Sequence, residues 1–249
     1  MPNALLLSAS REGETGYLEH AIPLIKEFLE SLNLATTPNV LFVPYAGVSI
    51  TFDQYHDMVQ IALTDLNINF SSIHQHDDEK QAIDKADVVF VGGGNTFALL
   101  DRLYKADLVE YISTKVQSGK AYIGWSAGSN IAGASIKTTN DMPIVEPQSF
   151  NALNIVPFQL NPHYTDYQAP GHNRETREMR LQEFMVVNPD TTIVGIQEGS
   201  ALRLSSNGLC LLGKKVAFEF KAGKKTEVKV NSNVAFMTST PVWPCSISK

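Results

Sequence analysis

The feature that most constrains the fold is an alternation of short apolar runs with amphipathic segments in the first half of the chain. The apolar runs are β-prone and occupy residues 4–8, 40–43, 87–91 and 121–123. Between them, apolar residues recur at helical spacing, for example over residues 18–29 and 52–66. This alternation predicts βαβ units, and therefore an α/β fold with a mostly parallel sheet and helices on both faces.

The second half of the chain is less regular. Residues 137–150 are polar, contain two prolines and predict a long loop. An amphipathic helix is expected over residues 175–187, with Met179, Phe184 and Val187 facing inward. Other strands are expected at residues 155–160, 192–196, 216–220 and 228–230.

A hairpin near the end of the chain completes the expected fold. Its strands, residues 201–204 and 209–212, flank the two-residue turn Asn207-Gly208. No internal repeat or clean linker divides the sequence. We therefore expect one α/β domain over residues 1–230 with C-terminal β-hairpin elements, and a partly ordered C-terminal extension over residues 231–249.

Composition and charge disfavour several classes of partner. The formal net charge of −6 argues against nucleic acid or an anionic membrane as the main partner. No apolar run approaches the roughly 20 residues of a membrane span, and the start of the chain lacks the basic region of a signal peptide. The two cysteines, Cys210 and Cys245, form neither a disulfide framework nor a zinc pattern. A cytoplasmic location is expected.

The strongest chemical motif follows the strand at residues 121–123. Residues 124–128 have the sequence G-W-S-A-G, which fits the nucleophile elbow of hydrolases. In such an elbow, Ser126 occupies a strained turn between strand and helix, and the Ala127 N–H at the helix N-terminus can bind an oxyanion. The competing interpretation is a plain glycine-rich turn.

A second glycine-rich loop follows the strand at residues 87–91. Nucleophiles and ligands in parallel α/β folds gather beyond the carboxyl ends of the strands, so this loop and Ser126 can share one crevice. Gly94 N–H is then the natural second oxyanion donor. A dinucleotide phosphate site is disfavoured, because G-G-G-N-T matches neither G-x-G-x-x-G nor a P-loop.

A serine nucleophile needs a base, and the base needs an orienting acid. Of six histidines, His163 is the best candidate for the base, because it follows a predicted strand. Pro162 also holds Asn161, the residue before the proline, in an extended conformation, which fixes the direction of the imidazole. The acid is Asp141, in the long loop, or Glu198, which ends a predicted strand as His163 does; residue positions do not decide between them. The sequence around His74 matches no trusted metal pattern, so we expect no metal and no cofactor.

Several motifs together resemble the peptidase E family, serine peptidase family S51. They are G-G-G-N-T-F at residues 92–97, I-G-W-S-A-G-S-N at 123–130, T-T-N-D-M-P-I-V at 138–145, N-P-H at 161–163 and E-T-R at 175–177. The resemblance implies a flavodoxin-like, class I glutamine-amidotransferase-like fold. It also implies a cytosolic serine peptidase that hydrolyses dipeptides with N-terminal aspartate, Asp-Xaa.

The resemblance also implies roles for single residues. Ser126 matches the nucleophile and His163 its base, Asp141 matches a charge-relay aspartate, and Glu198 matches a glutamate also proposed as third triad member. Arg177 matches an arginine that binds the substrate's aspartate side chain, since a guanidinium binds a carboxylate through two hydrogen bonds. The alternative is that Arg177 forms an ordinary surface ion pair.

Two other functions stay open at this point. One is a cyanophycinase-like hydrolase of β-aspartyl peptides on the same scaffold, and the other is a non-catalytic module that binds acidic peptides. An amidotransferase is disfavoured because its nucleophile is a cysteine, where this chain has Ser126. An α/β-hydrolase esterase is disfavoured because its histidine comes near the C-terminus. The expected partner is a small peptide substrate, and the expected state a monomer or homodimer.

Overall fold

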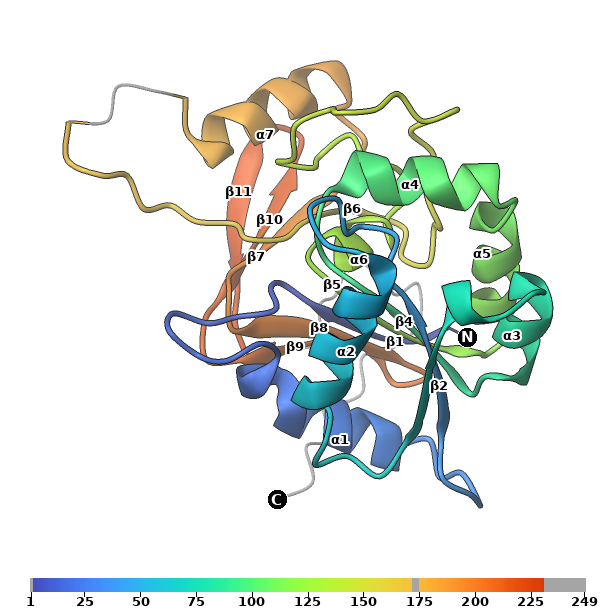
Figure 1. Cartoon of the computed structure of the whole chain (residues 1–249). Helices are drawn as coiled ribbons and strands as arrows, with labels where there is room; N and C mark the ends of the chain where they lie inside the picture. Colours follow the sequence, from blue (N-terminus) through green and yellow to red (C-terminus); the bar gives the residue numbers. More distant parts are fainter. Residues whose placement is uncertain (1, 172–174, 231–249) are drawn as a thin grey trace.

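A computed structural model of the chain describes residues 2–171 and 175–230 (Figure 1). The predicted extension over residues 231–249 lies outside these described residues, so its partial order and the domain boundary at residue 230 stay predictions. Among the described residues, no helix is both long and apolar enough to cross a membrane.

The main sheet has seven strands in the order β3-β2-β4-β5-β1-β8-β9. The strands are β1 (Asn3–Leu7), β2 (Asn39–Val43), β3 (Asn69–Ser72), β4 (Val88–Val91), β5 (Ala121–Trp125), β8 (Ser200–Ser205) and β9 (Gly208–Gly213). Strands β1 to β5 are parallel, whereas β8 and β9 form the predicted hairpin: β8 runs antiparallel to β1, and β9 runs antiparallel to β8. The mostly parallel sheet with a C-terminal hairpin is therefore confirmed.

Helices cover both faces of this sheet (Figure 1). They are α1 (Ile22–Glu30), α2 (Phe52–Ala62), α3 (Glu79–Lys85), α4 (Thr96–Lys105), α5 (Val109–Gln117) and α6 (Ala127–Asn130), with short 3-10 helices η1 (Glu19–Ala21) and η2 (Ile73–Gln75). Side chains alternate across each strand, so Leu5 and Phe90 pack with α1 and α2. Leu6 and Val89 pack with α3, α4 and α5 on the other face.

A second, smaller sheet has the order β11-β10-β7-β6. Its strands are β6 (Gln159–Asn161), β7 (Ile193–Ile196), β10 (Ala217–Lys221) and β11 (Lys224–Val228), and α7 (Arg177–Val187) packs on it (Figure 1). Strands β6 and β7 are parallel, so their carboxyl ends lie side by side. A separate small core of Tyr164, Leu181, Met185, Ile193 and Phe220 joins α7 to this sheet.

The face of α7 differs from the prediction. Leu181 and Met185 are its buried residues, whereas Met179 is 55% exposed and Val187 is 79% exposed. Only Phe184, of the three residues expected inward, packs against the small core. The prediction was wrong because a helix on a four-stranded sheet buries a narrow stripe, and the apolar residues outside that stripe stay at the surface.

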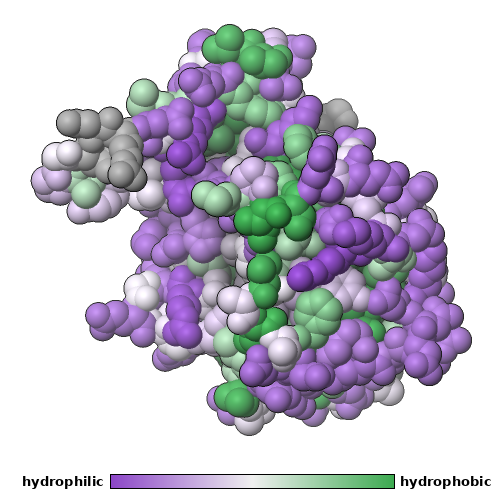
Figure 2. Space-filling view, turned by 45° about the horizontal axis from the view of Figure 1, so that its top comes forward, coloured by the Kyte–Doolittle hydropathy of each residue, from purple (hydrophilic) through white to green (hydrophobic). Residues whose placement is uncertain are grey.

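The face of the molecule that Figure 2 shows is mostly hydrophilic. Figure 2 shows polar residues over most of one face, with apolar residues gathered at its top and in a narrow central strip. Large exposed apolar side chains include Met142 in the long loop and Val186 at the end of α7. The long loop itself is confirmed, since residues 137–150 contain no helix or strand.

Candidate active site

The turn from β5 into α6 has the conformation expected of a nucleophile elbow. Ser126 has φ 53° and ψ −113°, a backbone conformation that residues other than glycine rarely adopt. A Cβ on Gly124 would overlap the Gly128 carbonyl, and a Cβ on Gly128 would overlap the Val91 carbonyl. Both glycines are therefore required for the close approach of strand and helix, and the predicted strained turn is present.

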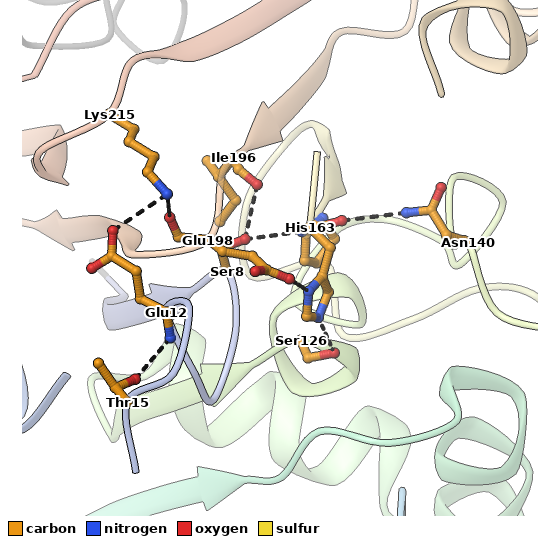
Figure 3. Close-up of polar contacts among 10 residues, drawn as sticks. Ser8, Glu12, Thr15, Ser126, Asn140, His163, Ile196, Glu198 and Lys215 are labelled. Atoms are coloured by element: carbon orange, nitrogen blue, oxygen red, sulfur yellow. Dashed lines mark hydrogen bonds and ion pairs between the residues drawn. The ribbon is translucent and has the colours of Figure 1, made fainter. Parts of the chain in front are cut away.

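Ser126 and Glu198 both hydrogen-bond the imidazole of His163 (Figure 3). His163 Nε2 lies 2.9 Å from Ser126 Oγ, and Nδ1 lies 2.7 Å from Glu198 Oε1. An ionised carboxylate accepts only, so Nδ1 carries the proton in this arrangement. In the neutral ring, Nε2 is then the acceptor for the serine hydroxyl, as a general base requires.

Parallel pairing in the small sheet brings His163 and Glu198 together. His163 lies two residues after Asn161, which ends β6, and Glu198 lies two residues after Ile196, which ends β7. His163 itself has φ 55°. Its N–H donates to Ser8 Oγ at 2.9 Å, and that hydroxyl donates to the Ile196 carbonyl at 2.8 Å. The imidazole is thus fixed by its backbone as well as by its ring contacts.

Ser8 is a residue that the sequence interpretation missed. It is fully buried, lies directly after β1 and connects the main sheet to the small one (Figure 3). The available signal was its position, because a hydroxyl directly after a buried parallel strand lies at the edge where ligands gather. The bonds that give it importance join residues far apart in sequence, and no local pattern shows them.

Lys215 supports Glu198 from the outer side (Figure 3). Its Nζ donates to the Glu198 carbonyl oxygen at 3.0 Å and lies 3.3 Å from Glu12 Oε1. The side chains of His163 and Glu198 are 34% and 49% exposed, so this part of the site faces solvent. Lys215 and Glu12 were also missed by the sequence interpretation, as they carry no motif.

The structure gives the Asp141 carboxylate partners other than His163. Its Oδ2 accepts from the Thr96 N–H at 2.7 Å and from the Thr96 hydroxyl at 2.6 Å. Among the described residues it makes no hydrogen bond to the imidazole. Of the two acids that the sequence left open, the geometry brings Glu198 to His163, because the carboxylate of Asp141 is engaged at the start of α4.

The two expected oxyanion donors are the backbone N–H groups of Gly94 and Ala127. Neither the Gly94 N–H nor the Ala127 N–H donates a hydrogen bond to any residue that the structure describes. Ala127 begins α6, so its N–H has no acceptor within the helix. A Cβ built on Gly93 would lie 3.0 Å from the Ser126 Cβ, which places the glycine loop directly against the serine.

Arg177, the first residue of α7, is half-buried. Its Nη1 is buried and has no hydrogen-bond partner among the described residues. Burial lowers the pKa of the guanidinium, Arg180 lowers it further, and Glu198 and Asp141 act in the opposite direction. The cation is therefore within electrostatic range of both candidate acids and has an unused donor.

Residues that were considered for a metal have other partners. His74 Nε2 lies 2.9 Å from Asp53 Oδ1, and Nδ1 lies 2.8 Å from the Ser72 hydroxyl. Within residues 2–171 and 175–230, no group of three or more histidine, cysteine, aspartate or glutamate side chains gathers as a metal site.

An α/β fold with a serine, histidine and carboxylate in one hydrogen-bonded row at the strand ends has the architecture of a serine hydrolase. Comparison with known proteins gives the family. The model of peptidase family S51 matches residues 4–212. The chain therefore belongs to peptidase family S51, and it is a peptidase, a hydrolase.

Similar proteins support this assignment. The chain is 60% identical over 218 residues to a peptidase E of Shewanella amazonensis, covering 88% of this chain and 91% of that one. It is 58% identical over 226 residues to a peptidase E of Shewanella denitrificans, covering 91% and 94%. The resemblance to the peptidase E family is thus confirmed.

The solved structure of a peptidase from an acI-B1 Actinobacterium shares the fold. Its TM-score is 0.68, the match covers 95% of this chain and 97% of that one, and the sequences are 16% identical. At that identity the likeness concerns the fold alone, and it supports the predicted fold class.

Proposed function

We propose that this chain is a serine-type dipeptidase that hydrolyses Asp-Xaa dipeptides. Ser126 is the nucleophile, His163 the general base and acid, and Glu198 the residue that orients the imidazole. The hydrogen-bonded row Ser126–His163–Glu198 is the observation that supports this proposal most strongly. It supplies the three functions that acyl transfer by a serine requires.

The reaction follows from these roles. His163 Nε2 removes the Ser126 proton as Oγ attacks the scissile carbonyl, and the Gly94 and Ala127 N–H groups stabilise the resulting oxyanion. His163 then gives the proton to the leaving amine, which departs as the carbonyl reforms in an acyl-enzyme. Water attacks the acyl group with His163 as base, and the Ser126 hydroxyl is restored as the aspartate product leaves.

Arg177 accounts for the preference for aspartate. A buried guanidinium nitrogen without an acceptor is costly, and binding a carboxylate would remove that cost. The planar fork of arginine suits the β-carboxylate of an N-terminal aspartate. Glutamate, longer by one methylene, would not place its scissile carbonyl at Ser126 while held by the same guanidinium.

A dipeptide panel tests the substrate. The purified protein is assayed at neutral pH with Asp-Leu, Asn-Leu, Glu-Leu and β-Asp-Leu, and Ser126→Ala serves as the inactive control. We expect hydrolysis of Asp-Leu and little of the others. Preferred cleavage of β-Asp-Leu would replace the proposal with a β-aspartyl hydrolase, and no cleavage of any peptide together with tight binding of Asp-Leu would favour a binding module.

Arg177→Gln tests the specificity role against Arg180→Gln as a matched control. Arg180 lies one turn further on, is exposed and pairs with Glu175. We expect kcat/KM for Asp-Leu to fall about 10²-fold or more with Arg177→Gln, as when a buried charge pair is broken, and to stay nearly unchanged with Arg180→Gln. Equal effects of the two substitutions would contradict the role of Arg177.

The remaining expectations are proposals of the same kind. We propose a cytoplasmic protein whose partner is the small peptide substrate, as a monomer or homodimer.

A further inference from the structure

Three aromatic side chains form a row beneath the glycine loop, and the proposed mechanism does not use them. Tyr55 lies on α2, Tyr17 in the loop before η1, and Trp125 at the end of β5. Tyr55 is 3% exposed and Trp125 is fully buried. Both belong to the core that α1 and α2 cover, and Tyr17 packs against it.

Hydrogen bonds connect this row to the loop. Trp125 Nε1 lies 2.8 Å from the Tyr17 hydroxyl, the Tyr17 and Tyr55 hydroxyls lie 2.9 Å apart, and the Tyr55 hydroxyl lies 2.8 Å from the Gly93 carbonyl oxygen. The indole can only donate and the carbonyl can only accept. Trp125 therefore donates to Tyr17, Tyr17 to Tyr55, and Tyr55 to Gly93.

The Gly93 carbonyl belongs to the same peptide group as the Gly94 N–H. In a trans peptide these two groups point in opposite directions, and no described peptide bond is cis. With its carbonyl held by Tyr55, the peptide directs the Gly94 N–H away from Tyr55. A Cβ built on Gly93 would lie 3.0 Å from the Ser126 Cβ, so the Gly94 N–H belongs to a peptide that lies next to the nucleophile.

The loop has no room for a side chain at Gly92 or at Gly94. A Cβ on Gly92 would lie 2.5 Å from the Tyr55 hydroxyl, so the glycine makes space for the hydrogen bond. Gly94 has φ 137°, and a Cβ there would overlap the Ala46 carbonyl. Each glycine of the loop therefore lies close to a different residue: Gly92 to Tyr55, Gly93 to Ser126 and Gly94 to Ala46.

We propose that Tyr55 is a positioning residue for the oxyanion hole: its hydroxyl, at the end of the row Trp125–Tyr17–Tyr55, fixes the Gly93–Gly94 peptide so that the Gly94 N–H points at the oxyanion. A carbonyl that accepts a hydrogen bond also makes the N–H of its own peptide a stronger donor. Tyr55 therefore acts on both the direction and the strength of that donor.

The protonation state of the row is suited to this task. Burial raises the pKa of Tyr55 well above its usual value, and burial also raises that of Tyr17. Both phenols stay protonated, so the donors are present throughout the neutral range.

Tyr55→Phe removes one oxygen atom and keeps the ring. We expect kcat for Asp-Leu to fall about tenfold to a hundredfold, somewhat less than the loss of a whole oxyanion donor, with KM within about threefold of wild type. The second measurement is the rate at which a small fluorophosphonate reacts with Ser126, because its P=O oxygen takes the oxyanion position. That rate should fall by a similar factor.

Two further variants separate positioning from general support of the fold. Tyr104→Phe removes a hydroxyl that donates to a different loop carbonyl, that of Asn151. This change should leave both kcat and the fluorophosphonate rate unchanged. Tyr17→Phe keeps the Tyr55–Gly93 bond but ends its cooperative support, so a loss of about twofold to fivefold is expected. The double variant should equal Tyr55→Phe within about twofold, since the two residues act in series.

Wild-type values of kcat and of the fluorophosphonate rate in folded Tyr55→Phe would overturn the proposal, as would an increase in KM with kcat unchanged. If Tyr55→Phe does not fold, wild-type rates in Tyr17→Phe overturn it. The inference rests on the proposed serine mechanism, and the fluorophosphonate distinguishes the two failures. Labelling of Ser126 without Asp-Leu hydrolysis refutes the substrate alone, whereas absence of labelling refutes the nucleophile and this inference with it.

Discussion

Ser126 and the two candidate oxyanion amides come from the main sheet, whereas His163, Glu198 and Arg177 come from the small sheet and α7. The main-sheet part is made of backbone: a strained φ at Ser126, and glycines where any side chain would overlap. The small-sheet part is made of side chains, two of which are one-third to one-half exposed. Ser8 joins the two parts through hydrogen bonds to His163 and to β7.

This difference separates two ways of building a site. Backbone geometry in the main sheet is fixed by the surrounding core, so changes there should cost stability as well as activity. The small-sheet residues lie over a separate, smaller core, so changes there should alter catalysis or specificity and leave the fold intact. Four predictions test this contrast, beginning with the largest effect.

His163→Ala removes the proposed base from the small sheet. We expect kcat to fall by about 10⁴-fold or more, because the serine loses its proton acceptor, while the melting temperature stays close to wild type. Steady-state kinetics and thermal unfolding of the same preparation check both. A large loss of stability would show that the small-sheet side chains are as structural as the elbow.

Glu198→Gln and Asp141→Asn compare the two candidate acids with the same isosteric change. Glu198→Gln should lower kcat by about 10²- to 10⁴-fold, since the amide no longer holds the imidazole in the required tautomer. Asp141→Asn should act mainly through the loop at Thr96 and lower kcat much less. The reverse order of effects would assign the orienting role to Asp141.

Gly128→Ala tests the main-sheet part. The new methyl group would overlap the Val91 carbonyl, so we expect a loss of about 3 kcal/mol or more in unfolding free energy. Gly223→Ala is the control in the small sheet, where φ is 75° but nothing lies within 4 Å. That change should cost about 1–2 kcal/mol. Equal losses in chemical denaturation would remove the contrast between the two regions.

Lys225→Met should have the smallest effect. Lys225 Nζ lies 2.7 Å from Asp166 and 2.8 Å from Glu178, the residue after Arg177. Burial alone would lower the pKa of Lys225, but hydrogen bonds to both carboxylates outweigh it and raise that pKa. Losing these two partly exposed ion pairs should lower the free energy of unfolding by about 1 kcal/mol. It should also raise KM a few-fold, because α7 is then held less firmly on the small sheet. An unchanged KM and an unchanged unfolding midpoint would show that the ion pairs of Lys225 do not help to position Arg177.

The main-sheet part of the site could be predicted from the sequence, because its requirements are local. The G-W-S-A-G motif and the triple glycine each describe a single turn, and the turns are as expected. His163 and Glu198 could be named as strand-end residues, but their contact depends on β6 pairing with β7 across more than thirty positions. Lys215 carries no sequence signal, and Ser8 has only its position directly after a strand; the hydrogen bonds that make both residues important join distant parts of the chain.

Peptide mapping by mass spectrometry after reaction with a fluorophosphonate shows whether a hydroxyl on the main sheet is activated by an imidazole from the small sheet. We expect one adduct, on Ser126, in the wild-type protein and none on the same time scale in His163→Ala. An adduct on another residue, or equal labelling of Ser126 in both proteins, would contradict it.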